Sequence, residues 1–179
     1  EAARKADVAI LCMGDNEETS GENFDRTDLN LPGRQLELVQ AVYATGTPVV
    51  LVLQSGRPVT ANWENDHLPA ILEAWFPGEQ GGTAIAKTLF GDAAPGGRLP
   101  ITFPRSVGQI PIYYNHHPRA RDEKAEWGGR YFDLDDSPMY PFGYGLSYTS
   151  YEYSDLEISV EDLTAQVTLR NTGKRAGRE

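Results

Sequence analysis

Two short apolar runs decide the fold: VAILCM at residues 8–13 and PVVLVL at residues 48–53. Apolar runs of this length, continuous rather than alternating, are typical of strands buried on both faces of a parallel sheet. A third and weaker run, AILEAWF, occupies residues 70–76. Together these runs predict three strands of one sheet.

Helical patterns lie between and after these strands. Residues 34–45 place three apolar side chains on one helical face, and Gly46 follows as a C-terminal stop. A short helix is expected before the third strand, and another over residues 83–90. Strands that alternate with helices predict an α/β fold with right-handed crossovers. We therefore expect residues 1–112 to form a mostly parallel sheet flanked by helices, an α/β sandwich of the flavodoxin-like kind.

The amino-acid composition changes after this α/β pattern. Residues 113–153 are rich in proline, glycine and tyrosine and are too aromatic for a disordered linker, so an ordered, wrapping connection is expected. Apolar and polar residues then alternate at 156–160 and 165–169, which predicts two antiparallel strands with one wet face. Since two strands cannot bury a core alone, residues 154–179 are expected to be the first part of an incomplete β-sandwich.

Charge and hydropathy exclude two classes of function. The 179 residues include 16 basic and 26 acidic side chains, for a formal net charge of -10, which disfavours a nucleic-acid partner. No apolar run approaches the roughly 18 residues of a membrane span. Residues 1–6 resemble the last turn of a helix, and the chain stops in charged residues directly after a strand-like run. We therefore expect the sequence to be a piece of a longer protein.

The most informative segment is an acidic loop, GDNEETSGENFDRTDLNLPG at residues 14–33, which contains six carboxylates. It follows the first strand, and ligands of open parallel sheets bind outside the carboxyl ends of the strands. Loops longer than roughly 12–15 residues in compact domains are usually functional or disordered. The residues alone leave open a solvated surface loop, a calcium site with poorly matching spacing, and acid–base chemistry by a carboxyl whose pKa its neighbours raise.

The part of this loop at residues 20–35, SGENFDRTDLNLPGRQ, closely resembles the acid/base segment of glycoside hydrolase family 3, the β-glucosidase family. Further segments resemble the family in its own order along the chain. They are residues 56–58, 74–78 with 81–82, 89–92, 95–100, 103–111 and 140–148. So many matches in order make the chain similar to the second α/β domain of the family, followed by the start of its fibronectin type III-like domain.

The resemblance implies part of a retaining, exo-acting β-glucosidase that hydrolyses terminal β-D-glucosyl residues. In this family an aspartate on an N-terminal (β/α)8 barrel forms the glycosyl-enzyme, and a glutamate of the second domain is the general acid/base. That glutamate corresponds to Glu22, with Glu17 and Glu18 as neighbouring alternatives. The nucleophile matches nothing here, so the chain alone is expected to be inactive. Retaining chemistry needs the two carboxyls about 5–5.5 Å apart, so the loop must reach the missing barrel.

Three residues near Glu22, namely Asn23, Asp25 and Arg26, are expected to affect the shape of the loop. Asp25 and Arg26 are expected to support the loop through an ion pair or hydrogen bonds. An arginine beside Glu22 would lower the pKa of Glu22 and oppose the acid role, so we expect the Arg26 guanidinium to be engaged elsewhere. Many relatives have a glycine or alanine where this chain has Asn23, a difference that affects the freedom of the backbone next to Glu22.

Two other functions remain open at this point. Within the family, the chain could come from a β-xylosidase or arabinosidase, because residues of the absent barrel set the sugar specificity. In another class, a non-catalytic flavodoxin-like binding module would leave the acidic loop as plain surface. No cofactor is expected, and no metal site, because the adjacent His116 and His117 cannot easily face one ion. The expected partners are β-linked glucosides or oligosaccharides and the missing barrel, and the resemblance favours a periplasmic or secreted location.

Overall fold

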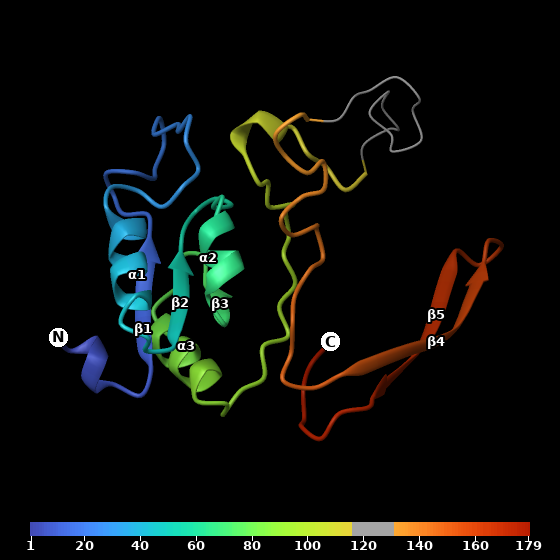
Figure 1. The fold of residues 1–179 in the computed structure, drawn as a ribbon. Helices are drawn as coiled ribbons and strands as arrows, with labels where there is room; N and C mark the ends of the chain where they lie inside the picture. Colours follow the sequence, from blue (N-terminus) through green and yellow to red (C-terminus); the bar gives the residue numbers. More distant parts are fainter. Residues whose placement is uncertain (116–130) are drawn as a thin grey trace. The chain divides into compact units, whose positions relative to one another are not determined.

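The computed structural model describes residues 1–115 and 131–179 (Figure 1). The described residues form two compact units. One comprises residues 1–79 and 100–143, and the other comprises residues 80–99 and 144–179. No helix in this described part is long and apolar enough to cross a membrane.

The first unit is built on a parallel sheet of three strands, β1 (Ala9–Gly14), β2 (Val49–Gln54) and β3 (Ala70–Glu73), in the order β1-β2-β3 (Figure 1). Helix α1 (Gln35–Tyr43) connects the first two strands, and α2 (Asn62–His67) connects the second and third. The parallel sheet with flanking helices that the apolar runs predicted is therefore confirmed.

The core of this unit is the central strand β2, which has a neighbour on each side. Val49, Leu51, Val52 and Leu53 are at most 2% exposed, and Val39 of α1 is fully buried with them. Each fully buried side chain of this kind contributes about 1.5–3 kcal/mol to stability. Burial on both faces, as the continuous apolar run predicted, is thus confirmed for β2.

The same prediction is wrong for β1. Exposure alternates along this strand, Ile10 is 44% exposed and the Cys12 side chain reaches solvent. Within the described sheet β1 is an edge strand that pairs only with β2, and α1 packs against it. An edge strand with one covered face buries only every second side chain.

Aromatic contacts hold the described part of the segment that follows the sheet. Phe103 is 3% exposed and forms an isolated antiparallel bridge with Tyr140, with ring centroids 6.2 Å apart. Tyr114 stacks on Phe142 at 4.4 Å, and the Tyr140 hydroxyl donates to the Asn65 side chain over 2.5 Å. The described part of this segment contains one short 3-10 helix, η2 (Val107–Gln109). Another 3-10 helix of the unit, η1 (Ala3–Lys5), precedes β1.

The second unit contains helix α3 (Gly81–Leu89) and an antiparallel pair of strands, β4 (Tyr151–Ser159) and β5 (Thr164–Asn171). Both predicted strands and the predicted helix are present. The apolar side chains of the strand pair remain exposed, for example Ile158 at 69% and Leu156 at 66%. Two strands alone offer these side chains nothing to pack against.

Candidate functional site: the carboxyl edge of the parallel sheet

Three chain segments meet at the carboxyl ends of the parallel strands. Asp15 follows β1, and its backbone N–H donates to the Gln54 carbonyl at the end of β2 over 2.9 Å. Ala74 follows β3, and its N–H donates to the Leu53 carbonyl over 2.8 Å. This is the edge at which open parallel sheets bind ligands, and the acidic loop begins there, as its place in the sequence indicated.

The start of the loop is fixed by the first residue of α1. The Gln35 side chain accepts a hydrogen bond from the Gly14 N–H over 2.7 Å and donates one to the Gly14 carbonyl over 2.8 Å. Gly14 has φ +141° and lies so close to Gln54 that an added Cβ would be 2.0 Å from the Gln54 carbonyl oxygen. Only glycine fits this close approach of two backbones.

Asp15 is the charged centre of the loop. Its carboxylate is 1% exposed, and Oδ1 accepts from Arg26 Nη1 over 2.9 Å and from the Thr19 hydroxyl over 3.1 Å. Arg26 Nη2 also donates to the Asn30 carbonyl over 2.6 Å. Arg26 is therefore engaged away from Glu22, as we expected, and its ion-pair partner is Asp15 rather than the adjacent Asp25. A charge-assisted pair of this kind, with a buried carboxylate, is among the stronger hydrogen-bonded contacts.

A second arginine reaches the loop from the turn after β2. Arg57 Nε lies 3.7 Å from Asp15 Oδ2, and its terminal nitrogens donate to the carbonyls of Thr19 and Phe24, each over 3.3 Å at the nearest. The Ser55 hydroxyl, which is fully buried, donates to the Arg57 carbonyl over 2.8 Å and holds this turn.

Glu22 occupies the tip of a tight turn. The Phe24 N–H donates to the Gly21 carbonyl over 3.1 Å, which closes a four-residue turn with Glu22 and Asn23 at its centre. Asn23 has φ +67°, and asparagine tolerates this left-handed region better than most residues. The Glu22 side chain is exposed and makes no hydrogen bond or ion pair with residues 1–115 or 131–179.

The other carboxylates that the sequence singled out, Glu17, Glu18 and Asp25, are also exposed. Glu17 and Glu18 are exposed in a preceding turn, where the Asn16 side chain accepts from the Glu18 N–H over 3.0 Å. Asp25 is exposed directly after the Glu22 turn. The structure therefore brings Asp15, Arg26 and Arg57 together and leaves Glu22, Glu17 and Asp25 facing solvent.

Glu73, at the end of β3, is a half-buried acid that the sequence did not single out, and its Oε2 is shielded from solvent. Burial raises its pKa to about 7, against the opposing effect of the Trp75 N–H, which donates to Oε1 over 2.9 Å. The negative charge of Asp15 raises the pKa further. Trp75 has φ +53° and packs edge-on against Phe103 with ring centroids 5.8 Å apart, so Glu73 anchors a strained turn.

The raised pKa predicts how stability depends on pH. An unfolded glutamate loses its proton near pH 4.5, whereas folded Glu73 keeps it to about pH 7. The free energy of unfolding should therefore fall by about 3 kcal/mol as pH rises through this window. In Glu73→Gln, which keeps an acceptor for the Trp75 N–H, that decline should be absent. Urea unfolding of both proteins at pH 4.5 and 7.5 measures the difference, and parallel pH curves would show that Glu73 does not titrate in this way.

Sequence reasoning missed Asp15, Gln35, Arg57 and Glu73 as parts of the site. One signal was available, because Asp15, Arg57 and Glu73 each stand within four residues of the carboxyl end of a predicted strand. Residues at these positions of a parallel sheet converge on one edge.

The described residues offer no cluster of three or more histidine, cysteine or acidic side chains that could hold a metal ion. His116 and His117, which we expected not to bind a metal, lie outside the described residues.

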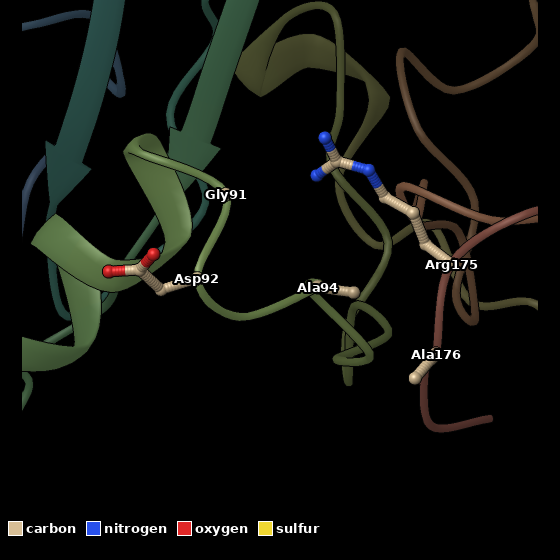
Figure 2. Close-up of a pocket in the computed structure, with 5 residues that line it drawn as sticks. All are labelled: Gly91, Asp92, Ala94, Arg175 and Ala176. Carbon is tan, nitrogen blue, oxygen red and sulfur yellow. The ribbon is translucent and has the colours of Figure 1, made fainter.

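A pocket in the second unit is lined by Gly91, Asp92, Ala94, Arg175 and Ala176. Figure 2 shows the Arg175 guanidinium directed toward Gly91 and the Asp92 carboxylate directed away from Arg175. None of the predicted site residues lines this pocket.

Comparison with known proteins identifies the relatives of this chain. Residues 1–148 match the model of the glycosyl hydrolase family 3 C-terminal domain. The chain is 46% identical to a periplasmic β-glucosidase of Salmonella typhimurium and 41% identical to a β-xylosidase of Formosa agariphila, in both cases over 99% of its length. It covers 24% and 25% of these relatives, so it spans about a quarter of their length.

Solved structures give the same result for the fold. A β-glucosidase from Erythrobacter marinus matches 98% of the chain with a TM-score of 0.88 and 44% identity, and the chain covers 24% of it. A β-glucosidase from Listeria innocua, solved in complex with glucose, matches 98% of the chain with a TM-score of 0.87 and 37% identity, and the chain covers 26% of it.

Proposed function

The chain belongs to glycoside hydrolase family 3, and on this premise we propose that it is the acid/base part of a retaining, exo-acting β-glucosidase, with Glu22 as the general acid/base. Relatives that carry such a segment within a chain about four times as long are named β-glucosidases. The nucleophilic aspartate and the (β/α)8 barrel that bears it lie outside this sequence.

One observation carries the assignment to Glu22: an exposed carboxylate at the tip of a turn whose base is held by buried ion pairs. A general acid must contact the leaving oxygen of a substrate bound on another domain, so it has to project from its own. The surrounding contacts also leave its carboxyl free, because Arg26 and Arg57 are occupied by Asp15 and by backbone carbonyls. Arg26 supports the loop in this proposal through Asp15 and the Asn30 carbonyl, and it does not contact substrate.

The test is the substitution of Glu22 in the full-length enzyme, with matched substitutions of Glu17 and Glu18 as controls. Rates are compared for β-glucosides with poor and with activated leaving groups, because only the former require protonation of the departing oxygen. A dependence on the leaving group that is specific to Glu22 supports the proposal. Equal behaviour of all three variants contradicts it.

A second candidate is a β-xylosidase, because one relative with this name is 41% identical over nearly the whole chain. The residues that would distinguish a glucoside from a xyloside lie on the barrel. Comparing kcat/KM for 4-nitrophenyl β-glucoside and 4-nitrophenyl β-xyloside in the full-length enzyme separates the two activities. We also propose a periplasmic location, in line with the name of the Salmonella relative.

The 179-residue chain on its own is expected to be catalytically inactive. Retaining hydrolysis needs two carboxyls about 5–5.5 Å apart on either side of the bond, and the proposal assigns only one of them to this chain. The purified chain should release no 4-nitrophenol from 4-nitrophenyl β-glucoside above the rate of buffer. Turnover that remains after repeated purification and disappears in Glu22→Gln would show that the nucleophile is present here.

A further inference from the structure

The loop that bears Glu22 is held from a different loop, on both sides of Glu22. Arg57 Nη2 donates to the Thr19 carbonyl over 3.3 Å, before Glu22, and to the Phe24 carbonyl over 3.3 Å, after it. The same nitrogen lies 3.4 Å from the Ser20 hydroxyl, and Nη1 donates to the Phe24 carbonyl over 3.4 Å. One guanidinium therefore closes the base of the turn.

Asp15 orients this guanidinium. Its Oδ2 lies 3.7 Å from Arg57 Nε, an ion-pair contact, and has no hydrogen-bond partner in the described chain, while Oδ1 accepts from Arg26 and Thr19. The carboxylate is 1% exposed and the Arg57 side chain is 21% exposed, so water competes little for the pair. Because the contact with Asp15 is made by Nε, both terminal nitrogens of Arg57 remain available for the loop carbonyls. The planar geometry of arginine suits this double use.

The Glu22 side chain has no contact of its own to fix it. It is exposed and makes no hydrogen bond or ion pair within the described residues. Its position is therefore set by the backbone of its turn, which the hydrogen bond between Phe24 and Gly21 closes and the contacts of Arg57 hold at both ends. A displacement of about 1 Å of a reacting group can cost about 100-fold in rate. The contacts of Arg57 with Thr19 and Phe24 therefore bear directly on the rate at which Glu22 can protonate a bound substrate.

We propose that Asp15 and Arg57 are positioning residues for Glu22, which hold the turn between Thr19 and Phe24 so that the acid meets the leaving oxygen. This inference rests on the proposed function of Glu22. Neither residue contacts the substrate in this proposal. Both act through the backbone that carries the acid.

The experiment uses Arg57→Met and Asp15→Asn in the full-length enzyme, with kcat/KM measured for methyl β-glucoside and for 2,4-dinitrophenyl β-glucoside. For Arg57→Met we expect a loss of about 10–100-fold with the methyl glucoside. We expect a loss below about 3-fold with the dinitrophenyl glucoside, whose leaving group departs without a proton. Asp15→Asn should show the same pattern, and the double variant should be no worse than the more severe single variant.

Arg34→Met is the matched control. Arg34 is an exposed arginine that pairs with Glu37 at the start of α1, outside the contacts of the Glu22 turn, and its loss should leave both rates unchanged. Should Asp15→Asn not fold, because Asp15 is buried, Arg57→Met decides alone. A merely structural role of Arg57 would lower both rates by the same factor, since it would reduce only the amount of folded enzyme. That result, or no change in either rate, overturns the proposal.

Glu22→Gln measured in parallel separates two kinds of failure. If Glu22→Gln shows the leaving-group dependence and Arg57→Met does not, the positioning role is wrong and the acid role of Glu22 stands. If Glu22→Gln shows no such dependence, the proposed function is wrong, and the positioning role falls with it because it acts only through Glu22.

Discussion

Glu22→Gln in the full-length enzyme is expected to lower kcat/KM for methyl β-glucoside by about 10²–10⁴-fold, the usual contribution of a positioned general acid. Methoxide is a poor leaving group and departs only if a proton reaches its oxygen. Glutamine is nearly isosteric and carries no acidic proton. For 2,4-dinitrophenyl β-glucoside, kcat/KM should change by less than about 10-fold, because the glycosyl-enzyme forms without acid assistance.

The second half of the reaction gives an independent measurement. In the proposed mechanism Glu22 is the base for hydrolysis of the glycosyl-enzyme, so kcat of the variant for the dinitrophenyl glucoside should be low. Azide needs no base, and its addition should raise kcat and yield a glucosyl azide. Glu17→Gln and Glu18→Gln, which alter exposed carboxylates of the preceding turn, should behave like wild type. If only Glu17→Gln or only Glu18→Gln shows both the leaving-group dependence and the rescue by azide, that glutamate is the acid/base and the assignment to Glu22 is wrong.

Gly14→Ala is expected to have the largest effect on stability, with a loss of more than about 4 kcal/mol or failure to fold. Its Cβ would lie 2.0 Å from the Gln54 carbonyl oxygen and 2.6 Å from the Gln54 carbonyl carbon, at φ +141°. These are backbone atoms of the central strand, so relief requires β1 and β2 to separate. The same movement would displace Asp15, which follows directly and donates to Gln54.

Two other glycines separate the steric clash from the cost of the backbone conformation. Gly33 has φ +62° with no atom within 4 Å of an added Cβ, so Gly33→Ala should cost only the roughly 1–2 kcal/mol of a left-handed alanine. Gly78 has open space and no positive φ, so Gly78→Ala should be nearly neutral. Urea unfolding midpoints of the three variants give the comparison, and a Gly14→Ala midpoint equal to that of Gly33→Ala would show that the strands accommodate the methyl group.

The regular elements were predictable because their signals are local. An apolar run such as residues 48–53 indicates a buried strand through its own composition. The alternation at residues 156–160 indicates a strand as well, but the expected burial of one face is not seen, because both faces of β4 are exposed. The exposure of β1 was not predictable in this way. Its run looks like that of β2, and the difference between them is their place in the sheet, edge against centre.

The acidic loop shows the same division. Its position after a strand and its resemblance to a family segment pointed to Glu22 from the sequence alone, and asparagine at position 23 suits the positive φ that the turn adopts. Which carboxylate the arginines would hold could not be read in advance. Asp15 lies in the same acidic loop as five other carboxylates, and burial beside the end of β2 is what distinguishes it.

The sequence by itself thus determined the strands, the helices and the family, and it predicts Glu22 as the acid. Only the tertiary structure decided that Asp15 pairs with Arg26 and Arg57, that Arg57 spans the Glu22 turn, and that partial burial raises the pKa of Glu73. The physical reason is that secondary structure follows from neighbours along the chain, whereas these pairings join residues far apart in sequence. They form only when parallel strands in register bring their carboxyl ends to one edge.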